Sequence, residues 1–423
     1  MRSVTVENIT VQFDRDGRSD FRRSGAVNWF GKPVIVQFRA HEFHFDLEGR
    51  IQRIDGFSAN HVWDWIQRTM ANDWLYYDGN SYSGDTPPPE PLIGDAVWAV
   101  NGRTDLPMLQ GHGGLQRDYV AKALAHFDDL IRTIRELVER RPGVELDDPN
   151  RLWCFLEKAA KNDRAQLQRI AEEIHGIHGG MAVLPPDTIA VDYRVILLKV
   201  MEGCVNACRF CTARGSLAFA MKSRDDIDRQ IAMLAAIYGE DRLNYNSVVL
   251  GECDALLSPE LEYAATQAYE AFACGASCLT GANLFLFATN KTFLAQSEAA
   301  LDRLEALPFD RIAINIGWEA GSDKVLRHLG KPQTARGVLA GMERAGVINR
   351  TRKKVQVSGN FLLTDQYECD DIAIAIRASQ YCGPLYLSPL RGQCSARHAL
   401  RDLAALKQVR PEVCVRLYTM QRL

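Results

Sequence analysis

The sequence predicts an α/β fold for its second half and a separate domain of mixed α and β character before it. From about Ala190 onward, short apolar runs alternate with amphipathic stretches of helical length. Alternation of this kind is typical of a parallel sheet with right-handed crossovers, either open or curled into a barrel. The chain has 423 residues, more than the roughly 250–300 residues at which one hydrophobic core stops growing. We therefore expect two domains.

The N-terminal domain, given the bounds 1–184, begins with strand patterns and ends with helices. Runs of alternating apolar and polar residues predict strands, and a Glu-Gly turn signal predicts a hairpin between the last two. The strand runs are Val4–Val6, Pro33–Phe38, His44–Leu47 and Ile51–Ile54. Asp78–Pro91 is rich in Gly, Ser and Pro and predicts an irregular loop. Apolar residues at spacings of three and four predict a helix over Asp118–Arg141, and two shorter helices follow at Leu152–Ala160 and Ala165–Ile174.

The second domain, given the bounds 185–390, contains six apolar runs that predict parallel strands covered on both faces. They are Val195–Val200, Ser247–Leu250, Leu284–Phe287, Arg311–Ile316, Val355–Val357 together with Phe361–Leu363, and Leu385–Leu387. Helices are predicted between them at Asp225–Tyr238, Pro259–Phe272, Lys291–Leu304, Ser322–Arg344 and Asp370–Tyr381. Residues 391–423 form a short C-terminal extension. In such sheets chemistry gathers at the carboxyl ends of the strands, which selects the residues that follow each run.

Three of the eleven cysteines, Cys204, Cys208 and Cys211, come just after the first of these runs. In a reducing compartment, clustered cysteines are metal ligands or catalytic groups more often than disulfides. Thiolates are the protein ligands of iron–sulfur clusters. Four of them would close a cubane, whereas three leave one iron open to a small molecule. Zinc is the alternative, but a structural zinc ion takes four ligands, commonly two Cys-x-x-Cys pairs.

The segment Gly203–Cys211 resembles the Cys-x-x-x-Cys-x-x-Cys signature of the radical S-adenosylmethionine (SAM) superfamily, including an aromatic residue, Phe210, before the last cysteine. The resemblance implies that Cys204, Cys208 and Cys211 hold a [4Fe-4S] cluster whose open iron chelates SAM. It also implies that one electron from the cluster splits SAM to a 5′-deoxyadenosyl radical, which abstracts hydrogen from a substrate. Phe210 is then the residue that contacts the adenine.

A second motif follows the second strand. Gly251 and Glu252 are similar to the last two residues of the family's Gly-Gly-Glu motif, whose backbone and acid bind the SAM ammonium group, with Leu250 in place of the first glycine. The next residue, Cys253, would lie close to SAM, where a thiol can donate or accept a hydrogen atom. A buried strand-end cysteine without a role is the alternative interpretation.

Two later segments extend the resemblance. Glu319 is similar to the acid of the family's Gly-x-Glu-Ser-Gly element, which binds the ribose hydroxyls, although Ala320 replaces the serine. Lys331 falls where related enzymes keep a basic residue for the SAM carboxylate. Gly359–Asp365 resembles the fifth-strand motif only loosely. Independently of the family, an acid just after a buried strand can pair with an ammonium group or accept hydroxyl protons, and such charge-assisted contacts are strong.

The resemblance covers about Leu184–Leu390 and implies a partial (β/α)6 barrel of the TIM type. It is specific for the superfamily and unspecific for the reaction, so the expected substrate is a small molecule or a peptide, with flavodoxin or ferredoxin as electron donor. The N-terminal domain does not resemble the cobalamin-carrying fold of some relatives. We expect it to cover the barrel mouth and exclude water. Leu184–Thr188 and Gly251–Leu256 resemble an uncharacterised branch of the superfamily, which supplies no substrate.

Composition points to a soluble cytoplasmic protein without a membrane or nucleic-acid partner. The net charge is −3, and no apolar stretch has the length of a signal-peptide core or a membrane helix. The basic run Arg350–Lys354 precedes a strand and predicts a solvated connection. The tail after Leu390 holds seven basic residues against two acids, which keeps radical modification of RNA or protein open, and a zinc-binding scaffold is the third hypothesis. Cys274 and Cys278 lack further paired cysteines, so we expect one cluster.

Overall fold

The computed structural model describes residues 2–13, 33–57, 63–70, 72, 74–77, 98–99, 113–144, 149–179, 183–191, 194–206, 208–211, 218–390 and 393–418. The chain divides into two compact units. The first unit holds residues 1–177 and 234–244, and the second holds residues 178–233 and 245–423. The loop predicted over Asp78–Pro91 lies outside the described residues.

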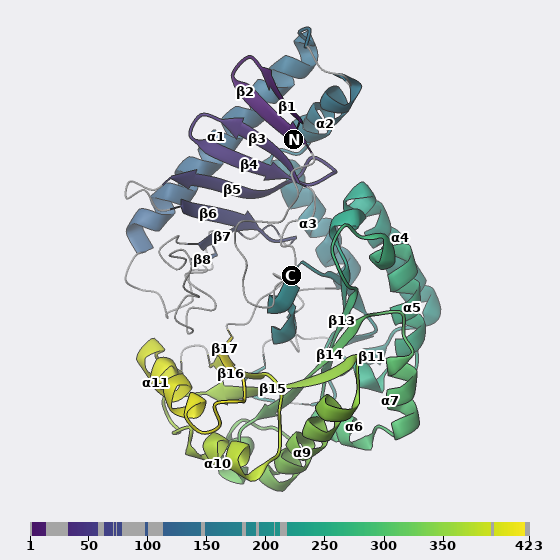
Figure 1. Ribbon diagram of the computed structural model, residues 1–423, viewed down its shortest axis with the longest axis vertical. Coiled ribbons are helices and arrows are strands. Elements are labelled where there is room, and N and C mark those ends of the chain that lie inside the picture. The colour runs from purple at the N-terminus through teal and green to yellow at the C-terminus, as the bar shows by residue number, and fades with distance from the viewer. Residues whose placement is uncertain are drawn as a thin grey trace. The chain divides into compact units, whose positions relative to one another are not determined.

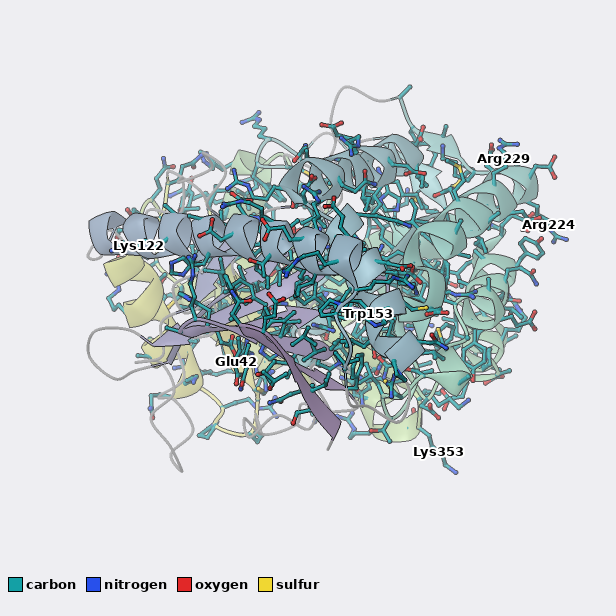
Figure 2. The ribbon with its side chains drawn as sticks, turned by 90° about the horizontal axis from the view of Figure 1, so that it is seen from above. Glu42, Lys122, Trp153, Arg224, Arg229 and Lys353 are labelled. Carbon is teal, nitrogen blue, oxygen red and sulfur yellow. The ribbon has the colours of Figure 1, made fainter. Side chains whose placement is uncertain are left out.

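The first unit is built on an antiparallel sheet whose strand order follows the chain, so each strand pairs with its neighbour in sequence. Its strands are β1 (Arg2–Val6), β2 (Ile9–Phe13), β3 (Val34–Phe38), β4 (His41–Phe45), β5 (Ile51–Phe57), β6 (Trp63–Arg68), β7 (Trp74–Tyr77) and β8 (Trp98–Ala99). The helices α1 (Gly113–Arg140), α2 (Pro149–Lys161) and α3 (Arg164–His178) follow. Figures 1 and 2 show α1 lying across one face of this sheet.

Apolar side chains fill the space between this sheet and its helices. Phe45 of β4 meets Phe155 of α2 edge-to-face, with 5.6 Å between ring centroids. Trp153 of α2, labelled in Figure 2, belongs to the same buried core. Because successive side chains of a strand point to opposite faces, the inward position of Phe45 turns Glu42 and His44 to the other face of the sheet.

A buried polar cluster joins the turn after β4 to the segment 234–244. The Asp241 carboxylate accepts a hydrogen bond from the backbone N–H of Leu47 at 3.2 Å, while Arg50 forms an ion pair with Asp46. Burial, reinforced by the neighbouring Asp46, raises the pKa of Asp241 to about 7. These contacts explain why segment 234–244 packs as part of the first unit.

The second unit is a sheet of seven parallel strands in the order β17-β16-β15-β14-β13-β12-β9. The strands are β9 (Ile196–Lys199), β12 (Ser247–Gly251), β13 (Asn283–Ala288), β14 (Arg311–Glu319), β15 (Val355–Leu363), β16 (Leu385–Pro389) and β17 (Val415–Leu417). The helices are α4 (Arg224–Tyr238), α5 (Leu261–Ala271), α6 (Asn290–Ala295), α7 (Glu298–Glu305), α8 (Asp323–His328), α9 (Ala335–Thr351), α10 (Asp370–Ala378) and α11 (Ala396–Lys407). The residues of α4 from Leu234 onward belong to the first unit. A small hairpin pairs β10 (Met201–Glu202) with β11 (Ala220–Met221). Figure 1 shows the helices on the outer side of a curved sheet.

The predicted α/β class and the separate N-terminal region of α and β elements are confirmed. The six predicted parallel strands are present, and β17 adds a seventh that the sequence analysis missed, because three residues carry too little alternation to predict a strand. The helix predicted over Lys291–Leu304 is two helices, since Ser297 caps a new one by accepting the N–H of Ala300. The helix predicted over Ser322–Arg344 is likewise divided into α8 and α9. No helix among the described residues has the length and apolarity to span a membrane.

Candidate functional site

The three predicted cluster cysteines lie in the loop after β10, beyond the carboxyl end of β9, and all are partly exposed. The backbone N–H of Asn206 donates to the Cys204 sulfur at 3.4 Å. Further along the loop, the N–H of Arg209 donates to the carbonyl oxygen of Leu329 at 2.9 Å. The loop is therefore tied to the turn that carries Lys331, which the sequence placed in the same site.

A fourth thiol joins this group. The Cys253 side chain is hydrogen bonded to Cys204, and this bond lowers the pKa of the Cys204 thiol to about 6. The same contact, together with burial, raises the pKa of Cys253. Burial raises the pKa of Cys208 against the opposing effect of Lys331. Cys204 is thus held toward the thiolate form, the form that binds a metal.

The cysteine sulfurs are spaced more widely than the ligands of one zinc ion. Tetrahedral zinc–thiolate bonds of about 2.3 Å put neighbouring sulfurs about 3.8 Å apart. Among the described residues, two groups of three ligands have all their ligand atoms within 4.8 Å of one another, and neither contains a cysteine. The trio is therefore not a preformed single-ion site. A cluster that spreads its ligands over three irons tolerates the wider spacing.

Glu319 ends β14 in a conformation that few residues adopt. Its φ of +65° lies in the left-handed region, and the register between β14 and β15 shifts between Gly317 and Glu319. A bulge of this kind re-aims a side chain. Oε1 of the carboxylate accepts a hydrogen bond from Nζ of Lys331 at 2.8 Å, whereas Oε2 is buried with no hydrogen-bond partner in the described part of the chain. An unsatisfied buried acceptor costs about 1–3 kcal/mol, so this oxygen is suited to a donor from a ligand.

Gly317 leaves the space that this carboxylate and its lysine occupy. A Cβ at that position would collide with Oε1 of Glu319 and lie 2.8 Å from Nζ of Lys331. Burial alone would lower the pKa of Lys331, but Glu319 and the nearby Cys208 raise it. Lys331 is therefore a charged group between the cysteine loop and Glu319.

Glu252 is held by a lysine that the sequence analysis did not identify. Nζ of Lys199 lies 3.2 Å from Oε2 of Glu252, and the two side chains are 2% and 5% exposed. Gln230 of α4 fixes the lysine backbone, accepting from its N–H at 3.2 Å and donating to its carbonyl oxygen at 3.0 Å. Burial raises the pKa of Glu252, and Lys199 opposes that rise. The sequence did hold one sign of this lysine's importance, because Lys199 is the one charged residue in the otherwise apolar run Val195–Val200.

The remaining predicted residues occupy less constrained positions. Gly251 ends β12, where a Cβ would meet the Leu197 side chain at 3.2 Å. Phe210 is half-buried in the cysteine loop. Asp254, which the sequence analysis did not select, is 2% exposed and accepts the Thr292 hydroxyl at 2.7 Å. Burial raises the pKa of Asp254.

The basic run before β15 is engaged with acidic neighbours. Arg352 donates to Glu298 at 2.6 Å and also pairs with Asp302. The backbone N–H groups of Lys353 and Lys354 donate to Glu305 at 2.9 Å. Figure 2 shows the Lys353 side chain extending outward from the ribbon. This segment has the character of a solvated, ion-paired connection.

One family model matches the part of the chain that holds these residues. Residues 198–362 match the sequence model of the Radical SAM superfamily. A search of curated proteins finds no match to the chain.

Several solved structures are similar at a low level. The radical SAM methyltransferase from Sphaerobacter thermophilus is 15% identical, with a TM-score of 0.39 over 53% of this chain and 65% of that one. SuiB from Streptococcus suis, bound to S-adenosylmethionine, is 12% identical, with a TM-score of 0.37 over 71% and 62%. The cobalamin-dependent S-adenosylmethionine radical enzyme OxsB is 14% identical, with a TM-score of 0.32 over 50% and 30%. The chain spans less than two thirds of each of these proteins, and similarity at this level does not define an activity.

The segment matched by the family model contains the cysteine loop, Glu252, Glu319 and Lys331, the residues that the site brings together. The chain therefore carries a radical SAM domain over residues 198–362.

Proposed function

We propose that this protein is a radical SAM enzyme in which Cys204, Cys208 and Cys211 hold a [4Fe-4S] cluster. Bound together, the cluster and SAM supply a 5′-deoxyadenosyl radical that abstracts a hydrogen atom from a substrate. One observation carries the proposal above the others. Oε2 of Glu319 is buried without a donor among the described residues, close enough to Cys208 to affect its pKa.

The side chains around Glu319 fit the sugar end of SAM. Lys331 holds Oε1 in place and leaves Oε2 open, so the carboxylate can accept a ribose hydroxyl without losing its ion pair. The missing side chain at Gly317 leaves room for this ion pair. The charge of Lys331 also stabilises neighbouring thiolates, because a nearby cation favours the ionised form of a thiol.

Glu252 fits the amino-acid end of SAM. Its carboxylate lies at the carboxyl end of β12, directly before Cys253, and is almost fully buried. A charge-assisted hydrogen bond from an ammonium group to such a carboxylate is worth about 1.5–3 kcal/mol. Lys199 opposes the rise that burial causes in the Glu252 pKa, and it is also positioned to compete with an incoming ammonium group.

The substrate we propose is a small molecule or a peptide, and the proposed electron donor is a flavodoxin or a ferredoxin. The chain's own residues set the cofactor chemistry, while the net reaction depends on a substrate pocket that none of these contacts defines. The proposed function is therefore limited to the radical step and the residues that bind its cofactors.

Anaerobic reconstitution with iron and sulfide, followed by dithionite and SAM, tests this function. We expect 5′-deoxyadenosine in the wild type and none in Cys208→Ala. Cys382→Ala is the matched control. Cys382 is also a partly exposed cysteine, but it lies in the connection before β16, where its thiol donates to the carbonyl oxygen of Gly346 in α9. Equal product from wild type and Cys208→Ala would refute the proposal, as would a reconstituted protein that holds zinc in place of an iron–sulfur cluster.

A further inference from the structure

The parallel sheet carries two asparagines that the proposed cofactor contacts do not use. One of them, Asn360 of β15, lies directly across from Gly317 of β14, and side chains paired in register point to the same face of a sheet. A Cβ at Gly317 would meet the Glu319 carboxylate and Nζ of Lys331. Asn360 is therefore the neighbour, on the next strand, of the space in which this ion pair forms.

This face of the sheet is the one turned away from the helices. Nε1 of Trp318 donates to Asn290 of α6 at 3.2 Å, and the Trp318 ring lies 5.8 Å from the ring of Phe361. Phe361 thus belongs to the helix-covered face, and Asn360, the residue before it, points to the opposite face. Figure 1 shows the helices outside the curved sheet, so Asn360 lies on its inner face.

The inner face is open to solvent at the carboxyl end of the strands and closed below it. Gly317, Asn360 and Leu362 are partly exposed. Two residues before Gly317 and Asn360 on the same strands, the register partners Asn315 and Ser358 are 1% and 2% exposed. A ligand that enters from the carboxyl end would therefore meet Asn360 first and stop at the level of Asn315.

Each asparagine keeps one polar atom free. Oγ of Ser358 donates to Asp187 at 2.5 Å, so it accepts from Nδ2 of Asn315 at 2.8 Å. This orients the amide and leaves Oδ1 of Asn315 buried, with no hydrogen-bond partner in the described part of the chain. Oγ of Ser388 donates to Oδ1 of Asn360 at 2.8 Å, and Nδ2 of Asn360 makes no hydrogen bond to the described residues. The inner face thus offers one free acceptor and one free donor.

The charged side chains beside these atoms are already paired. Nζ of Lys331 lies 2.8 Å from Glu319, and Nζ of Lys199 lies 3.2 Å from Glu252. A ligand with a net charge pays a desolvation cost unless an opposite charge meets it, and these two pairs offer no unpaired charge to a second ligand. An uncharged group that presents a carbonyl oxygen and an N–H matches the free donor and the free acceptor.

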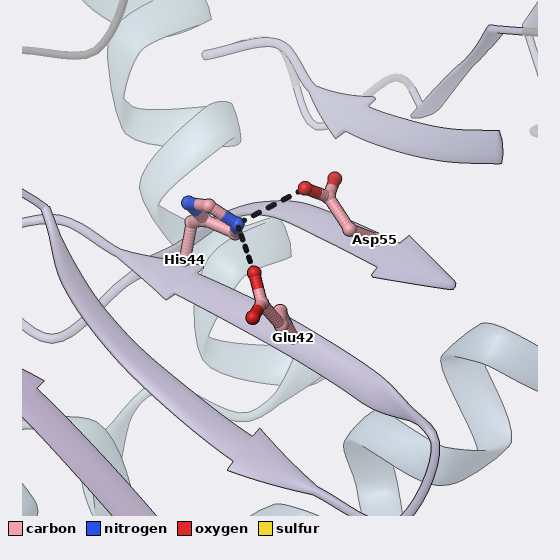
Figure 3. A group of neighbouring side chains, drawn as sticks. All are labelled: Glu42, His44 and Asp55. Atoms are coloured by element: carbon pink, nitrogen blue, oxygen red, sulfur yellow. Dashed lines mark ion pairs between the residues drawn. The ribbon is translucent and has the colours of Figure 1, made fainter. Parts of the chain in front are cut away.

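Polar side chains in the first unit are in the opposite situation. Figure 3 shows the His44 imidazole facing Asp55 and Glu42, with Nε2 at 3.2 Å and 3.9 Å from their oxygens. Arg53 donates to Asp55 at 2.8 Å. These groups pair with one another and need no ligand, whereas the two asparagines each leave one amide atom free.

We propose that the substrate carries a neutral amide group, as in a carboxamide or a peptide bond, and that Asn360 and Asn315 bind it. Nδ2 of Asn360 donates to the amide carbonyl oxygen, and Oδ1 of Asn315 accepts from the amide N–H. The inference rests on the proposed function, because it places the substrate beside the ribose end of SAM. It deepens that function by naming the class of substrate and two residues that select it.

Ligand-observed NMR tests the proposal on the full-length, cluster-reconstituted protein with SAM and an oxidised cluster, so that no turnover occurs. The probes are N-methylacetamide and its isostere methyl acetate, which keeps the carbonyl group and lacks the N–H donor. Because a neutral hydrogen bond changes a binding constant by roughly two- to tenfold, we expect the wild type to bind the amide at least about threefold more tightly than the ester.

The two asparagines should leave different signatures. Asn360→Asp replaces the N–H donor with an acceptor and should weaken the binding of both probes at least about fivefold, because both present a carbonyl oxygen. Asn315→Ala removes the acceptor and should make the amide bind no better than the ester. Asn360 is partly exposed, so its variant stays informative if Asn315→Ala fails to fold.

Asn283→Asp is the matched control. Asn283 lies on the same face of the sheet, since it pairs in register with Arg311, but at the amino end of β13. Its Nδ2 donates to Ser247 and Gly281. The variant should bind both probes as the wild type does.

Three results would overturn the proposal: equal affinity of the wild type for the two probes, unchanged binding in Asn360→Asp, or an equal loss in Asn283→Asp. A loss of SAM affinity in Asn360→Asp, measured by calorimetry, would also overturn it, because Asn360 would then contact SAM itself. Formation of 5′-deoxyadenosine reports separately on the proposed function. If the wild type forms this product but does not distinguish the probes, only the substrate inference fails. If the probes behave as expected and no product forms, the amide site stands and the proposed function fails.

Discussion

Replacement of Lys199 with methionine should destabilise the second unit and change how Glu252 titrates. The two side chains are 2% and 5% exposed, and their charged atoms lie 3.2 Å apart. Removal of one partner from a buried ion pair costs about 3–5 kcal/mol, because the other charge is left buried without compensation. Burial already raises the pKa of Glu252, and Lys199 is the main group that opposes it. We therefore expect a still higher pKa for Glu252 in Lys199→Met.

The sign of the pH dependence follows from this shift. In the variant, the folded state keeps a proton on Glu252 that the unfolded chain releases above the ordinary pKa of 4.5. The folded state then binds more protons than the unfolded state, so the stability of Lys199→Met falls as pH rises from about 4.5 toward the raised pKa. Glu202, the other acid that acts on Glu252, pushes its pKa in the same direction.

Thermal unfolding between pH 5 and pH 8, combined with hydrogen exchange of β9 and β12, measures both effects. The double variant Lys199→Met/Glu252→Gln should recover most of the lost stability, because it removes both buried charges. Lys222→Met is the control: its partner Glu202 is partly exposed, so the loss should stay below about 1 kcal/mol. The reasoning fails if Lys199→Met and Lys222→Met are equally stable, or if the double variant is no better than the single one.

Three further substitutions test separate contacts. Gly317→Ala places a methyl group against the Glu319 carboxylate and should weaken SAM binding at least about tenfold, while the amount of bound iron stays constant. Calorimetry measures the SAM affinity and an iron assay measures the cluster content. An unchanged SAM affinity would count against a role for the space beside Gly317. Cys253→Ala removes the hydrogen bond to Cys204 and should lower the reduction potential of a bound cluster, whereas Cys253→Ser keeps a hydrogen-bond donor. A redox titration followed by electron paramagnetic resonance compares the potentials of the two variants, and identical potentials would contradict a role for this hydrogen bond. The pKa of Asp241 rises from 3.8 to about 7 on folding, so the free energy of unfolding should fall as pH rises through that interval. Denaturant unfolding of Asp241→Asn should show a weaker dependence of this free energy on pH, and an unchanged dependence would exclude Asp241 as its source.

The features that could be predicted from the sequence are those that a short stretch of residues determines by itself. The spacing of Cys204, Cys208 and Cys211 is local, and so are the apolar runs that became parallel strands. Glu319 was selected because it follows a buried run, and the structure gives it a buried side chain near Lys331. Its position after a strand is the signal that selected it, since parallel strands share a carboxyl edge.

What the sequence could not predict depends on register and on close approach. Glu42 and Asp55 face each other only because β4 and β5 pair in one particular register, which includes a bulge between His44 and Phe45. A slip of one residue would turn these side chains to opposite faces. Gly317 is similar: the sequence marks a glycine, but the carboxylate and ammonium groups that require it come from later in the chain.

The two lysines at the site hold their acids in different ways, and this difference predicts how each half of SAM binds. Lys331 uses one oxygen of Glu319 and leaves the other open, so a hydroxyl donor can bind without displacing a cation. At Glu252 an ammonium group must share the carboxylate with Lys199. Under the proposed function, Lys199→Met should therefore change the affinity for methionine and leave the affinity for adenosine unchanged. Calorimetry with each fragment separates the two sites, and equal changes for both fragments would mean that Lys199 acts on the site as a whole and not through Glu252.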